Sequence, residues 1–76
     1  MTTYINNTRS ESILTINIES SENLKEALHL SEPGNKDVYL TLTAGLGIND
    51  IDVPAGKEVR VANNTVATFL AVRSAN

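Results

Sequence analysis

The sequence predicts a mainly β fold, a small antiparallel β-sandwich or barrel, and three observations lead to it. Threonine, valine and isoleucine are frequent, and β-branched side chains suit a pleated sheet. Apolar and polar residues alternate in several stretches, which is the period of a strand with one buried face. Proline, glycine and asparagine pairs separate these stretches at short intervals. Because the chain has 76 residues, we expect a single domain over 1–76.

Three stretches carry the strand alternation. The side chains expected on their buried faces are Leu14, Ile16 and Ile18 in 12–18, Val38, Leu40 and Leu42 in 37–43, and Val59 and Val61 in 57–61. Turn signals lie between them. Pro33 and Gly34 in 32–35 predict a type II turn, and Pro54 and Gly56 in 53–57 predict a second turn. The stretch 43–50, with two glycines, predicts a looser connection.

The segment 20–30 fits two structures. Leu24, Ala27 and Leu28 have helical spacing, and Ser21 is placed to cap a helix that starts at Glu22. We therefore expect a short helix or helical turn near 21–30. The alternative is a strand at 27–30 that pairs with 37–43, and Leu30 enters a strand in either case.

An asparagine pair interrupts the apolar pattern of 59–72. Asparagine tolerates positive φ, so Asn63-Asn64 predicts a sharp turn between two strands. The following segment 65–72 is apolar on both faces; Val66, Leu70 and Val72 form one face, and Ala67, Phe69 and Ala71 form the other. We expect a strand there, with a helix from Thr65 as the alternative. The similar stretch 4–16 contains Asn6-Asn7, and the two are either hairpins repeated in one sheet or a chance similarity.

Few residues carry reactive chemistry. The chain has no cysteine, which excludes disulfides and thiolate metal sites, and one histidine, His29, expected at the surface. Asp50 and Asp52 are expected on the exposed face of a strand edge, because a calcium loop needs more oxygens at defined spacing. We expect no catalytic residue, no metal, no cofactor and no small-molecule substrate, and therefore not an enzyme.

Charge and hydropathy exclude further classes. The net charge is −3 and the six basic residues are scattered, so nucleic acid is not an expected partner. The chain has neither a membrane-length apolar run nor a signal-peptide pattern, so we expect no membrane partner and a chain made and kept in a cytosol, unless it leaves as part of a larger particle. Asn6 and Asn63 begin glycosylation motifs that we interpret as coincidental.

Because the chain is short and has no disulfide or metal, we expect assembly to stabilise it further. A strand over 65–72 that is covered on both faces is either central between layers or buried against another subunit. The residues expected to form an interface are Phe69, Leu70, Val72 and Tyr39, and the expected partners are other copies of the chain.

The stretch 40–65, "LTLTAGLGINDIDVPAGKEVRVANNT", resembles small structural modules of tailed bacteriophages, such as capsid decoration proteins and fibre segments. In these modules a short strand leads into a turn like Val53-Pro54-Ala55-Gly56-Lys57, then a strand, then an asparagine-rich turn. The resemblance implies a virion structural protein that is made in the host cytoplasm. It also implies a homotrimer as the favoured assembly and a capsid protein as a second partner. The alternative is a small phage-encoded inhibitor or adaptor that binds a host protein.

Overall fold

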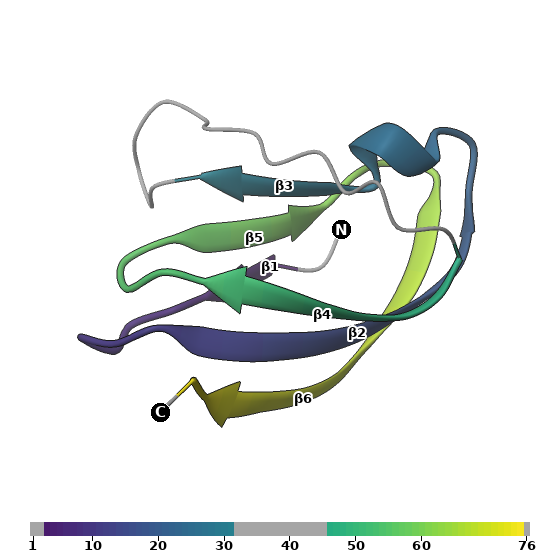
Figure 1. The fold of residues 1–76 in the computed structure, drawn as a ribbon. Coiled ribbons are helices and arrows are strands. Elements are labelled where there is room, and N and C mark those ends of the chain that lie inside the picture. The colour runs from purple at the N-terminus through teal and green to yellow at the C-terminus, as the bar shows by residue number, and fades with distance from the viewer. Residues whose placement is uncertain (1–2, 32–45, 76) are drawn as a thin grey trace.

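The computed structural model describes residues 3–31 and 46–75 (Figure 1). Its elements are β1 (Thr3–Ile5), β2 (Ser12–Ser21), the 3-10 turn η1 (Leu24–Glu26), β3 (Leu28–Ser31), β4 (Gly47–Val53), β5 (Glu58–Val61) and β6 (Thr65–Ser74). The mainly β prediction is confirmed, as are strands at 12–18, 57–61 and 65–72. The predicted strand 37–43 and the turn at 32–35 lie outside the described residues. The loose connection predicted over 43–50 is wrong from Gly47 onward, where β4 begins.

The strands form two antiparallel three-stranded sheets. We call them the β5 sheet, with order β1-β5-β3, and the β2 sheet, with order β4-β2-β6 (Figure 1). Each described connection between strands passes from one sheet to the other. The two asparagine pairs therefore join strands of different sheets, β1 to β2 and β5 to β6, and the hairpin interpretation is wrong. The two connections are nevertheless equivalent: each leads from the β5 sheet to the β2 sheet. The strands they leave are neighbours, since β1 pairs with β5, and the strands they enter are neighbours, since β2 pairs with β6.

The core lies between the sheets, on the faces that the alternation predicts. Among residues 3–31 and 46–75, its buried apolar side chains are Leu14, Ile16, Ile18, Ala27, Leu28, Ile51, Val53, Val59 and Val61. The central strand β2 supplies a run of three, and its partner β4 contributes Ile51 opposite Leu14. Burial of these side chains is the main driving force for folding in a domain without disulfides.

Segment 22–30 holds a helical turn followed by the start of a strand, and the alternative's pairing of that strand with 37–43 lies outside the described residues. One 3-10 turn forms, in which the Glu26 backbone amide donates to the Asn23 carbonyl at 3.1 Å. The chain then enters β3, where Leu28 pairs with Val61, so the helical turn ends before Leu28. The predicted cap is wrong: Ser21 ends β2, and its hydroxyl lies 3.2 Å from the Thr65 hydroxyl.

Asn6 connects the β1–β2 loop to the turn between β4 and β5. Its side chain is completely buried, and its amide nitrogen donates to the Val53 carbonyl at 2.8 Å and the Ser10 carbonyl at 3.1 Å. Its amide oxygen accepts from the backbone amide and the hydroxyl of Thr8, at 3.0 and 2.6 Å. Its backbone bonds to Gly56 and Lys57, both at 2.9 Å. One side chain therefore bonds to four polar groups, of which the Val53 carbonyl is fully buried with it.

The turn between β4 and β5 depends on a left-handed backbone at Gly56. The Lys57 amide donates to the Pro54 carbonyl at 3.2 Å, and Gly56 has φ of 76°. A side chain added there would meet nothing within 4 Å, so its cost is conformational. We expect Gly56→Ala to lower the free energy of unfolding by about 1–2 kcal/mol, measured by urea denaturation.

The control for that prediction is D-alanine at position 56, introduced by chemical synthesis. A D-residue prefers positive φ, so this chain should be at least as stable as the natural one. Equal destabilisation by both alanines would contradict the backbone explanation.

Candidate interaction surface

The strand β6 forms one edge of the β2 sheet. It is ten residues long, and within residues 3–31 and 46–75 its only strand partner is β2. Threonine and valine favour the strand over the alternative helix. Three large apolar side chains on it are about half exposed: Val66 at 52%, Leu70 at 50% and Val72 at 48%. An edge of this length with apolar side chains is a template for pairing with another chain.

A β-bulge at Leu70 changes which side chains of β6 share a face. Thr15 pairs with Ala71 and Ile16 pairs with Phe69, so Leu70 has no opposite residue. Val72 then lies opposite Leu14, and Phe69 and Val72 both fall on the core-facing side. The predicted alternation, with Leu70 and Val72 on one face and Phe69 on the other, is therefore wrong. Period-2 patterns cannot show an inserted residue.

The four expected interface residues are not equivalent. Phe69 is half-buried and packs against the core, whereas Leu70 and Val72 are half exposed at the edge. Tyr39 lies outside the described residues. The structure thus brings Phe69, Leu70 and Val72 together on one edge strand.

Side chains of opposite charge lie near the two ends of β6. Near its start, the Thr68 hydroxyl donates to a Glu19 carboxylate oxygen at 3.3 Å, and the Asn64 side chain donates to Glu22 at 3.3 Å. Near its end lies Arg73, the one charged residue in the strand. Glu19 is brought beside Thr68 by a second register shift, between Ile18 and Ser20.

A polar network crosses the outer face of the β2 sheet. Arg73 donates to the Asp50 carboxylate at 2.8 Å and to the Thr15 hydroxyl at 2.9 Å, and that hydroxyl donates to Asp50 at 2.7 Å. These hydrogen bonds, from Thr15 first and then Arg73, hold the pKa of Asp50 below its ordinary value. Asp50 and Asp52 share the exposed face of β4 around buried Ile51, as predicted.

This network predicts a pH dependence of stability. Because the pKa of Asp50 is lower in the folded chain than in the unfolded chain, its stabilisation is present above the unfolded value of about 4. It is lost as the pH falls through the lower folded value. We expect the melting temperature of Asp50→Asn to fall less than that of the natural chain between pH 6 and pH 2. Asp52→Asn is the control and should follow the natural chain; equal slopes for all three would contradict the prediction.

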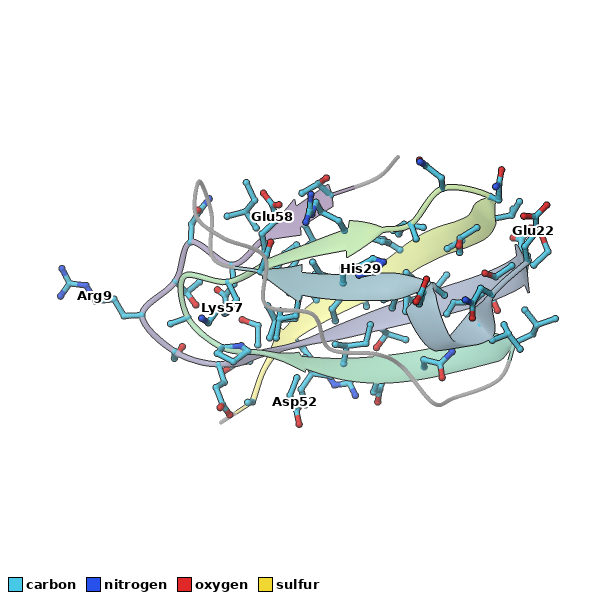
Figure 2. All side chains as sticks on the ribbon, turned by 90° about the horizontal axis from the view of Figure 1, so that it is seen from above. Arg9, Glu22, His29, Asp52, Lys57 and Glu58 are labelled. Carbon is cyan, nitrogen blue, oxygen red and sulfur yellow. The ribbon has the colours of Figure 1, made fainter. Side chains whose placement is uncertain are left out.

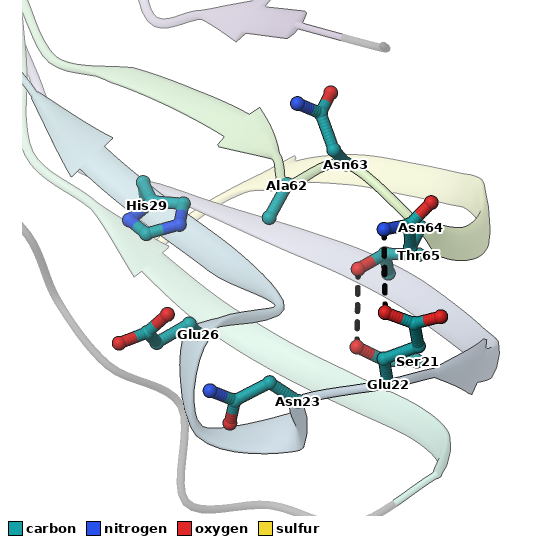
Figure 3. Close-up of a pocket in the computed structure, with 9 residues that line it drawn as sticks. All are labelled: Ser21, Glu22, Asn23, Glu26, His29, Ala62, Asn63, Asn64 and Thr65. Carbon is teal, nitrogen blue, oxygen red and sulfur yellow. Dashed lines mark hydrogen bonds between the residues drawn. The ribbon is translucent and has the colours of Figure 1, made fainter.

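A shallow depression of about 200 Å³ lies where β2 and β6 meet η1 and β3 (Figure 3). This volume is below the roughly 300–1,000 Å³ of typical small-molecule sites. Two hydrogen bonds join the end of β2 to the start of β6 here: the Ser21 and Thr65 hydroxyls share one, and the Asn64 side-chain amide donates the other to the Glu22 carboxylate. Asn64 has φ of 63°, the positive value expected of the Asn63-Asn64 turn. These contacts hold the corner of the sandwich.

His29 lines this depression on the outer face of β3, away from buried Leu28, as expected for a strand (Figure 3). In the described ranges, no group of three or more histidine and acidic side chains is placed to hold a metal ion. Charged side chains are instead spread over the surface, with Arg9 and Glu22 at opposite ends of the molecule (Figure 2).

Comparison with known proteins gives no further guide, because no family model, curated protein or solved structure matches the chain. No helix in the described part of the chain is both long and apolar enough to cross a membrane.

Proposed function

We propose that this chain is a non-enzymatic assembly module of a virion, in the manner of a capsid decoration or fibre protein. The observation that carries the proposal is the ten-residue edge strand β6 with Val66, Leu70 and Val72 half exposed. Other copies of the chain and a capsid protein are the proposed partners, bound by strand pairing and apolar contact.

The two edges of the β2 sheet differ in a way that supports β6 as the binding edge. In the part of the chain that the structure describes, β4 is the other edge strand; it carries Asp50 and Asp52, and charges on an edge hinder pairing with other strands. β6 has no charge before Arg73. Selection against aggregation usually protects both edges, so an apolar edge of this length is favoured where pairing is useful.

The virion assignment is supported by the segment that resembles phage modules. Within its described part, 46–65, the strand β4, the turn at Pro54-Ala55-Gly56, the strand β5 and the Asn63-Asn64 turn follow in the order seen in those modules. Such modules bind at repeated positions of the capsid lattice, which requires a stable small fold and an edge strand that can pair with a partner.

The test is the composition of purified virus particles produced by cells that express the gene in its natural genomic context. We expect the chain in many copies per particle, and at least tenfold less of Leu70→Lys, because a charge at the edge opposes pairing. Ile48→Lys is the matched control, since Ile48 is 72% exposed on β4. Absence of the natural chain from particles would contradict the proposal and favour an inhibitor or adaptor.

A further inference from the structure

We propose that two copies of the chain pair antiparallel through β6, about a two-fold axis between Leu70 and Ala71. This inference rests on the proposed role of β6 as the binding edge and names its first partner. Pairing of one edge with its own copy is isologous and closes as a dimer, so it differs from the trimer expected from the sequence. The two three-stranded β2 sheets would become one continuous sheet.

The bulge at Leu70 restricts the register of such a pair. Opposite residues in an antiparallel sheet point to the same face. The pairing with β2 places Ala67, Phe69, Val72 and Ser74 on the core-facing side, and Thr68, Ala71 and Arg73 on the outer side. In the proposed register, Val72 lies opposite Phe69 of the second copy and Arg73 lies opposite Thr68. A slip of one residue would set Phe69 against Ala71, which points to the other face.

Charge complementarity selects this register over one shifted by two residues. Arg73 opposite Thr68 approaches Glu19 of the second copy, because the Thr68 hydroxyl already bonds to that carboxylate. In the single chain the Arg73 guanidinium reaches across β2 to Thr15 and Asp50, so in the dimer it exchanges these partners for Glu19 of the second copy, which lies beyond the free edge of β6. The shifted register sets Arg73 against Val66 and loses this contact. The two-fold axis makes the contact twice.

Apolar contact completes the fit. Val72 and Leu70 are about half exposed in the single chain, and Phe69 is half-buried. With Val72 beside Phe69 of the second copy, and Leu70 at the axis, all three lose contact with water. Their burial adds to the backbone hydrogen bonds along the paired edges.

Cysteine cross-linking tests the register directly, because the chain has no cysteine of its own. In the proposed dimer the two copies of residue 71 flank the axis on the same face, roughly 6 Å apart between Cα atoms, within disulfide range. We expect Ala71→Cys to form a disulfide dimer at least tenfold faster than Thr68→Cys under mild oxidation. The two copies of residue 68 would lie roughly 17 Å apart.

Each alternative gives a different result. Parallel pairing brings every position of β6 near its own copy, so equal cross-linking of the two variants would overturn the proposal. A fast reaction of Ile48→Cys, on the opposite edge of the sheet, would overturn it too. As a second measurement, Glu19→Gln should raise the dimer dissociation constant about two- to thirtyfold. An unchanged constant would contradict the register. If the chain enters particles but Ala71→Cys does not cross-link, this inference fails and the proposed function stands.

Discussion

Replacing Asn6 with alanine is expected to lower the free energy of unfolding by about 3–5 kcal/mol, because one fully buried hydrogen bond and three part-buried ones are lost at once. The Val53 and Ser10 carbonyls and the Thr8 amide and hydroxyl all bond to this one side chain. A domain of 76 residues has a total stability of roughly 4–11 kcal/mol. The variant should therefore be close to unfolding at room temperature.

Urea denaturation followed by circular dichroism measures this loss. The neighbouring Asn7 is exposed, so Asn7→Ala is the matched control and should change stability by about 0.5 kcal/mol or less. Asn6→Asp, which keeps the shape but sets a carboxylate against two carbonyls, should be at least as damaging as alanine. Equal stability of the Asn6→Ala and Asn7→Ala variants would show that Asn6 does not connect these segments as described.

Leu14→Ala is expected to cost about 2–5 kcal/mol, the range for a large side chain removed from a closed core. Leu14 is completely buried on the central strand β2, between Ile51 of β4 and Val72 of β6. Neighbouring strands fix the backbone on both sides, so little collapse of the cavity is possible.

The same substitution at Leu70 provides the control. Leu70 is 50% exposed, and Leu70→Ala should cost about 1 kcal/mol or less in the monomer. Both values come from thermal or urea unfolding at a concentration where each variant is monomeric. A Leu14→Ala loss no larger than that of Leu70→Ala would contradict the assignment of the core.

Much of the fold was predictable because period-2 alternation reports burial of one face. Leu14, Ile16 and Ile18 fall on the buried side of β2, and Val59 and Val61 do so in β5. Gly56 and Asn64 both take the positive φ that their turns require. Alternation does not say which sheet a strand joins. It therefore could not predict that each described connection leads from one sheet to the other.

The remaining errors have local physical causes. Glycine and asparagine are common in loops, so Gly47 and Asn49 indicate a loop in the sequence. β4 nevertheless starts at Gly47, because the long strand β2 pairs with it as far as Ile18. Asn6 fits a turn, and only its distant contacts with Val53 and Gly56 show that it is buried. A polar residue that is buried through long-range hydrogen bonds leaves no local signal.

The residues expected at an interface lie together on one strand, but their geometry was not predicted. Phe69, Leu70 and Val72 all belong to β6, which within residues 3–31 and 46–75 pairs with β2 alone. Which of them faces the core depends on the bulge at Leu70. That bulge follows from the register of two long strands, which a single strand does not encode.

The claim that β6 pairs with β6 of a second copy is tested most directly by the molar mass of the chain in solution, measured by light scattering over a range of concentrations. The natural chain should approach twice the monomer mass of 8.2 kDa as concentration rises. Leu70→Lys should stay monomeric with an unchanged far-ultraviolet spectrum, while Ile48→Lys should dimerise normally. A natural chain that remains monomeric at every concentration, or a Leu70→Lys variant that associates as strongly as the natural chain, would contradict the claim.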